Sequence, residues 1–111
     1  MRVENPLLPG TPDVNCTKGW IELKQCDKWP GGDASLRVKH FTPQQKVWLR
    51  RRWQHDQRAW LLLHCQNDFI LLNGDVAAKM LGSSNRQELI SASTGHWVDI
   101  LPKEELQKCL A

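Results

Sequence analysis

Apolar and charged residues alternate over residues 20–25, and this alternation predicts a β-strand. Successive side chains of a strand point to opposite faces, so Trp20, Glu22 and Lys24 share one face while two aliphatic side chains share the other. We expect the aliphatic face to pack against the core and the charged face to border a site that is open to solvent.

Two later segments, residues 60–65 and 69–72, are almost continuously apolar, and a polar triplet at residues 66–68 separates them. Runs of this kind are typical of strands that are buried on both faces, and the triplet fits a turn between them. A short strand over residues 13–16 is expected before the charged one. The sequence therefore predicts a mixed central sheet of about four strands.

The dipeptide Thr42-Pro43 indicates the start of a helix, because threonine caps the first turn and proline fits the first helical position. This helix is expected to continue to about residue 55. Helical spacing places Leu49 on one arc of its surface and Trp53 on another.

The C-terminal part of the chain should add small helices, the first of them capped by Asp75. They are expected over residues 76–81, 86–92 and 103–110. Residues 27–39 show little periodicity and are expected to form a mobile loop, in which Trp29 could meet an unpaired base. At 111 residues the chain is expected to form a single domain over residues 1–111, of the α/β (α+β) class, with helices flanking the sheet.

Positive charge is concentrated in the middle of the chain, although the formal net charge is only +3. Between Arg37 and Arg58 there are seven lysines or arginines and one acid, Asp56. A basic segment on a nearly neutral chain is typical of a surface that binds a phosphate backbone. A solvated helix face would show the same composition, and both interpretations remain open at this point.

Cysteine usage and hydropathy exclude other classes of protein. The four cysteines have no CxxC spacing, so we expect free thiols in a reducing cytoplasm rather than a zinc site. No signal peptide is visible, and no apolar stretch is long enough to span a bilayer. The sequence therefore predicts a cytoplasmic protein without a membrane partner.

The candidate chemistry lies in two short segments. Asp13 follows Pro12, and Glu22 and Lys24 follow on the next expected strand, which would bring two carboxylates and an ammonium group together. Carboxylate oxygens select hard cations, so Mg²⁺ is expected, and Mn²⁺ can substitute for it. A divalent cation beside a lysine suits hydrolysis of a phosphodiester bond.

Three motifs carry a resemblance to a known family. They are Gly10-Thr11-Pro12-Asp13, Gly19-Trp20-Ile21-Glu22-Leu23-Lys24 and Phe41-Thr42-Pro43-Gln44-Gln45-Lys46-Val47-Trp48-Leu49. Together they resemble the PD-(D/E)xK nucleases, and most of all the small stand-alone virus-type replication-repair nuclease (VRR-NUC) modules of phages, relatives of the Holliday-junction resolvases. The resemblance covers roughly residues 4–72 and implies a restriction-endonuclease-like core.

The resemblance implies a role for each matching residue. Asp13 and Glu22 would ligate the divalent cation together with the backbone carbonyl of Leu23. Lys24 would position the attacking water and offset charge in the transition state, and Gln45 would lie beside the site.

Glu4 stands where the family carries a further acid, normally on an N-terminal helix. Three residues precede Glu4 in this sequence, so that helix is expected to be nearly absent. Glu4 is therefore a possible additional metal ligand, and the arm that carries it is expected to be unanchored, shortened or completed by a partner chain.

The function that these features imply is a metal-dependent DNA endonuclease, selective for branched or junction DNA. A general degradative or nicking phage endonuclease and a non-catalytic nucleic-acid-binding subunit remain alternatives. The residues expected to contact the DNA backbone are Lys39, Lys46, Arg50, Arg51 and Arg52. A homodimer is expected, because a junction is cut on two strands and residues 60–72 would leave apolar surface uncovered in a monomer. For a phage-encoded chain, the location would be the host cytoplasm.

Overall fold

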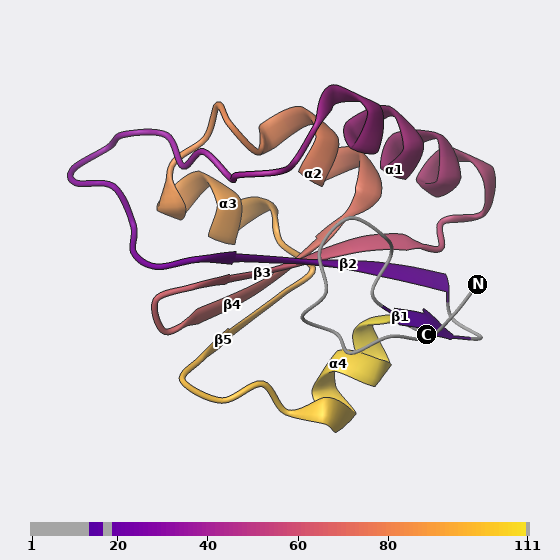
Figure 1. The fold of residues 1–111 in the computed structure, drawn as a ribbon. Helices are drawn as coiled ribbons and strands as arrows, with labels where there is room; N and C mark the ends of the chain where they lie inside the picture. Colours follow the sequence, from indigo (N-terminus) through magenta and orange to yellow (C-terminus); the bar gives the residue numbers. More distant parts are fainter. Residues whose placement is uncertain (1–13, 17–18, 111) are drawn as a thin grey trace.

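A five-stranded mixed sheet forms the framework of the chain, in an α+β arrangement (Figure 1). The computed structural model describes residues 14–16 and 19–110. In chain order the elements are β1 (Val14–Cys16), β2 (Gly19–Cys26), α1 (Pro43–Asp56), β3 (Ala59–Cys65), β4 (Asp68–Asn73), α2 (Gly74–Met80), α3 (Arg86–Ala92), β5 (Gly95–Val98) and α4 (Lys103–Leu110). The predicted α+β class, with a mixed sheet and flanking helices, is confirmed.

The strands lie in the sheet in chain order, from β1 to β5. β2 and β3 are parallel, with Glu22 opposite Leu61 and Lys24 opposite Leu63, and every other neighbouring pair is antiparallel. α1 forms the connection between the two parallel strands. A parallel pair requires a connection of this length, whereas the antiparallel pair β3–β4 is joined by a tight turn.

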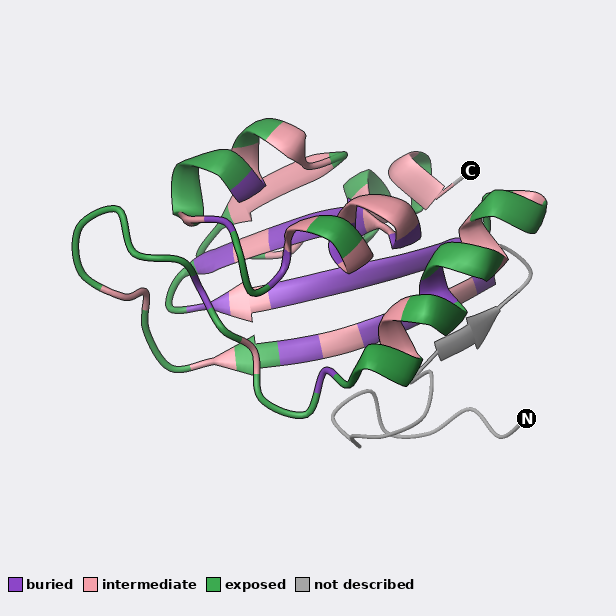
Figure 2. Cartoon of the chain, turned by 90° about the horizontal axis from the view of Figure 1, so that it is seen from above, coloured by how far each residue is buried: buried purple, intermediate pink, exposed green. Residues whose placement is uncertain are grey.

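Helices cover the two faces of the sheet unequally (Figure 1). α1, α2 and α3 lie over one face, where Leu61 and Leu63 are fully buried. α4 lies over the other face, where Trp60 and Leu62 are buried and Leu106 packs against them. Figure 2 shows the result: β3 and β4 are mostly buried and the outer surface of α1 is exposed.

The start of α1 agrees with the sequence prediction. Thr42 accepts a hydrogen bond from the Gln45 backbone N–H, and the Gln45 side chain accepts one from the Thr42 backbone N–H. This reciprocal cap satisfies two backbone donors that the first helical turn leaves without partners. The predicted arcs were wrong, because Leu49 is buried and Trp53 packs against the same core. Residues four apart lie on one face of a helix.

Two details of the C-terminal half differ from prediction. Asn73, rather than Asp75, caps α2 by accepting a hydrogen bond from the Val76 backbone N–H. β5 was not predicted, because its four residues are too short to show a periodic pattern. A side chain at Gly95 would collide with the Trp97 ring, so this glycine lets the indole lie back over the strand.

The loop before α1 is anchored at two points, Trp29 and Leu36, and its mobility stays a prediction. The indole N–H of Trp29 donates to Asp68 at 2.8 Å, so this ring is held by a hydrogen bond within the protein. Leu36 is 4% exposed, and its backbone exchanges hydrogen bonds with Ser84 and Gly82 in the segment between α2 and α3. Trp29 and Leu36 are therefore part of the packed structure, whereas residues 31–35 between them are exposed.

The apolar strands leave no uncovered surface of the kind predicted. Leu71 and Ile70 of β4 are 0% exposed, on opposite faces of the sheet. The exposed large apolar side chains among residues 19–110 are instead Val47, Trp48, Val98 and Ile100. The argument that β3 and β4 need a partner is therefore wrong, while the dimer itself stays a prediction.

The cysteines whose side chains the structure describes are free thiols: Cys26, Cys65 and Cys109. The side chain of Cys16 lies outside the described part of the chain. Among the described residues, none of the helices has the length and apolar character that a membrane span requires.

Candidate active site

β2 is the strand on which the candidate site is built. Its first residue, Gly19, has φ +110°, and a Cβ there would lie 2.1 Å from the Arg58 carbonyl oxygen. The next residue, Trp20, donates its backbone N–H to that same oxygen at 2.9 Å. Glycine is needed at this point because L side chains rarely adopt such a φ and because the backbones are close. The contact sets the register of β2 against β3.

Glu22 and Lys24 form an ion pair on the face of β2 that lies under α1. Lys24 Nζ is 3.4 Å from Glu22 Oε2, and the residues are 6% and 5% exposed. The predicted alternation along the strand is correct. The prediction that this charged face is open to solvent is wrong, because both residues are almost fully buried and the His40–Phe41 segment packs against Lys24.

Lys24 also connects β2 to the segment that leads into α1. Its ammonium donates to the His40 carbonyl oxygen at 3.0 Å and lies 5.8 Å from the centre of the Phe41 ring. His40 has φ 62°, and this left-handed backbone precedes the buried Phe41. Lys46, from α1, lies 5.5 Å from the same ring. The sequence does not predict the contacts of Lys24 with His40 and Phe41, because Lys24 and His40 are 16 positions apart in the chain.

Gln45 lies in the first turn of α1, close in sequence to the segment that Lys24 contacts. Its side-chain oxygen is occupied by the helix cap, at 3.1 Å from the Thr42 nitrogen. Gln45 therefore positions the start of α1 above β2. The expectation that it also acts within the site stays a prediction.

The remaining predicted metal ligands are only partly described. Asp13 and Glu4 lie outside the described residues. β1 begins at Val14, which pairs with Ile21, the neighbour of Glu22. Leu23 directs its side chain into the core on the α4 face. Among residues 14–16 and 19–110, no cluster of three or more His, Cys, Asp or Glu side chains could hold a metal ion.

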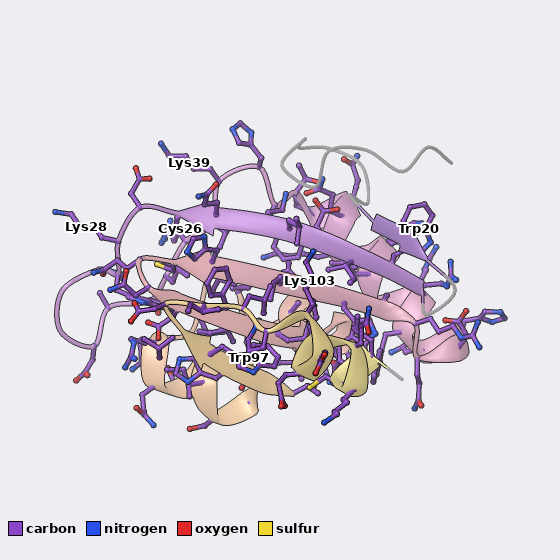
Figure 3. All side chains as sticks on the ribbon, turned by 90° about the horizontal axis from the view of Figure 1, so that it is seen from below. Trp20, Cys26, Lys28, Lys39, Trp97 and Lys103 are labelled. Carbon is purple, nitrogen blue, oxygen red and sulfur yellow. The ribbon has the colours of Figure 1, made fainter. Side chains whose placement is uncertain are left out.

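The predicted DNA-contacting residues fall into two groups. Three of them have partners within the protein: Lys46 donates to the Leu81 carbonyl, Arg50 pairs with Asp75 and Arg52 pairs with Asp56. Lys39 and Arg51 are exposed, and within the described part of the chain neither has an ion pair. Figure 3 shows Lys39 projecting away from the ribbon. Of the five residues predicted to contact DNA, Lys39 and Arg51 are therefore the two that no ion pair or side-chain hydrogen bond within residues 19–110 occupies.

A second polar centre surrounds Asp68, which sequence reasoning placed in a turn. Its carboxylate accepts hydrogen bonds from Trp29 Nε1 at 2.8 Å, Arg86 Nε at 2.9 Å and Arg86 Nη2 at 3.2 Å, and contacts His96 Nε2 at 2.7 Å. Burial raises the pKa of this carboxyl, but the hydrogen bonds from Arg86, His96 and Trp29 outweigh burial and lower it to about 2. Asp68 thus stays ionised and joins the loop, α3 and β5.

Two neighbouring thiols lie beside this centre, at the end of β2 opposite Trp20 (Figure 3). Cys26 and Cys65 are register partners on the parallel strands. Burial, and then the nearby Cys26 thiol, raise the pKa of Cys65 to about 12, and burial also raises that of Cys26. Both thiols are therefore protonated and poor nucleophiles at neutral pH.

Comparison of the chain with protein-family models, curated proteins and solved structures finds no match.

Proposed function

We propose that this protein is a metal-dependent DNA endonuclease that hydrolyses phosphodiester bonds, with branched or junction DNA as its preferred substrate. The observation that supports the proposal most directly is the Glu22–Lys24 pair, held at 3.4 Å on one face of β2. Burying two charges costs several kcal/mol per ion, roughly, and a small domain gains little stability from such a pair. A chemical role would explain why this chain contains a buried ion pair at this position.

The donor set suits Mg²⁺. Glu22 provides one carboxylate, and Asp13 with the Leu23 carbonyl would complete the oxygen ligands that such an ion prefers. When bound, the ion would lower the pKa of a water molecule and offset charge on the phosphate. Lys24 would hold its ammonium next to that phosphate, where developing negative charge is stabilised by a fixed cation.

The surroundings of the pair fit a polyanionic substrate. Lys39 precedes His40, whose carbonyl Lys24 contacts, and Arg51 lies on the outer surface of α1. These cations would neutralise backbone phosphates irrespective of sequence. A small module of this kind reads DNA shape more readily than base sequence, which favours branched substrates over a specific recognition site.

We further propose a homodimer as the working form, since paired cuts at a junction need two active sites at a fixed separation. The exposed Val98 and Ile100, at the end of the edge strand β5, are the apolar side chains available for that contact. Figure 1 shows that the end of β5 and the segment after it lie away from α1.

The decisive experiment measures cleavage of supercoiled plasmid and of a four-way junction in parallel, with Mg²⁺, with Mn²⁺ and with EDTA. Glu22→Gln should abolish cleavage while DNA binding is kept. Asp68→Asn is the matched control, since it also neutralises a buried carboxylate in an ion pair, far from the Glu22 pair along β2 and β3.

Both variants are assayed well below their melting temperatures, so that lost stability does not imitate lost catalysis. Cleavage of plasmid and junction at equal rates would favour a degradative or nicking enzyme. Binding without cleavage would favour a non-catalytic subunit, and an active Glu22→Gln protein would exclude the proposed site.

A further inference from the structure

Trp48 is an exposed tryptophan in the middle of a basic helix. It is 41% exposed, although tryptophan side chains are usually largely buried, and it lies on α1 one turn before Arg51 and Arg52. Residues three and four apart are neighbours on a helix surface, so the indole and the two guanidinium groups share one side of α1. An aromatic ring beside a cation is a typical surface for binding nucleic acid.

The ring of Trp48 is held in place by a second indole. Trp20, from β2, packs edge-to-face against it with ring centroids 5.4 Å apart and planes at 80°. An edge-to-face contact uses the edge of one ring and leaves other ring surface available for stacking. Trp48 is therefore both exposed and fixed in orientation.

This pair stands next to the candidate active site. Trp20 and Glu22 are two residues apart on one face of β2, which corresponds to about 7 Å along a strand. Glu22 in turn contacts Lys24, so the order along the strand is indole, carboxylate and ammonium. A ligand that stacks on Trp48 would therefore lie at the Trp20 end of this face of β2.

We propose that Trp48, supported by Trp20 and flanked by Arg51, binds an unpaired base of a DNA strand by stacking. Every base has an aromatic face, so such a site tolerates any sequence but requires that the base be out of the duplex stack. Arg51 would contact the adjoining phosphate. The inference rests on the proposed function and refines its substrate: DNA with an unpaired base beside the cut, as at a branch point or single-strand gap.

The other described tryptophans are less suitable. Trp29 donates its indole N–H to Asp68, Trp53 and Trp60 pack edge-to-face against each other at 5.0 Å, and Trp97 lies back over Gly95. Those rings contribute to packing. Within residues 19–110, Trp48 is the one tryptophan that is exposed.

The test is equilibrium binding by the full-length protein in EDTA, so that cleavage plays no part. The probes are a fluorescein-labelled oligothymidylate and a duplex of equal length. Trp48→Ala should weaken binding of the single strand about tenfold, as loss of one stacked base predicts, while duplex affinity changes little. Trp48→Phe should keep most of the single-strand affinity, because a smaller aromatic ring still stacks.

Val47→Ala is the matched control, since Val47 is 49% exposed on the same helix and carries no ring. The proposal is overturned if wild-type protein does not bind the single strand. It is also overturned if Trp48→Ala binds it as tightly as wild type, if Trp48→Ala weakens single strand and duplex equally, or if Val47→Ala loses as much. The binding assay needs no cleavage. A wild-type protein that binds the single strand but does not cleave DNA would therefore contradict the proposed function without contradicting the stacking site.

Discussion

The Lys24 ammonium lies 3.4 Å from the Glu22 carboxylate, and both residues are at least 94% buried, being 6% and 5% exposed. Because Lys24 also donates to the His40 carbonyl, the pair joins β2 to the segment that leads into α1. Removing either side chain would take away the ion-pair partner of a buried charge and lower the free energy of unfolding. The effects of a mutation on stability and on DNA cleavage must therefore be measured separately.

Lys24→Met should lower the turnover of DNA cleavage on the order of 10²-fold, with little change in DNA affinity, if the ammonium stabilises developing charge. It should also destabilise the fold by about 3 kcal/mol, because it removes the ammonium group that pairs with the buried Glu22 carboxylate. Single-turnover cleavage and urea denaturation measure the two effects separately. A loss confined to DNA affinity would make Lys24 a phosphate-binding residue only.

The double variant Glu22→Leu/Lys24→Met provides the control for that experiment. Replacing a buried ion pair by apolar side chains of similar volume is often neutral for stability. We therefore expect near wild-type stability and no cleavage. A double variant that is stable and still cleaves DNA would show that the pair is structural.

Arg51→Ala should weaken binding to all DNA sequences alike. Its removal should reduce the slope of log affinity against log salt by about 0.9, the contribution of one phosphate contact. Arg52→Ala is the comparison, since that guanidinium is bound to Asp56 at 2.9 Å. Fluorescence anisotropy at several salt concentrations measures both slopes. Equal slopes for wild type and Arg51→Ala would mean that Arg51 makes no phosphate contact and that this basic surface faces only solvent.

Asp68 should make the protein sensitive to acid. Its pKa of about 2 in the fold is below its value in the unfolded chain, so the unfolded state binds more protons at intermediate pH. The stabilisation is present above about pH 4 and is lost as the pH falls towards about 2, and amounts to about 2 kcal/mol. Urea denaturation of wild type and Asp68→Asn at several pH values should show this loss in wild type alone.

Oligomeric state can be tested at the end of β5. Ile100, 72% exposed, should lie in the proposed dimer contact, so Ile100→Glu should give a monomer in sedimentation velocity without lowering the melting temperature. Val47→Glu, on the opposite side of the molecule, should leave the dimer intact. A wild-type monomer that cleaves junctions on both strands would exclude the dimer as the working form.

Local chemistry in the sequence determined much of the fold. Thr42-Pro43 predicted the start of α1 because a helix cap is made by residues three apart, and the alternation from Trp20 to Lys24 predicted which side chains share a face. The resemblance to nucleases selected Glu22 and Lys24 from such patterns. These local patterns do not depend on which segments of the chain pack over the strand.

Only the tertiary structure decided which of those faces is covered. The burial of Lys24 involves His40, which is far from it in the chain, and the exposure of Trp48 depends on how α1 is rotated over the sheet. Asp68 gathers donors from residues 18 to 39 positions away, a separation at which no periodic pattern operates. Contacts between distant segments are set by strand register and packing, and for that reason the sequence alone does not reveal them.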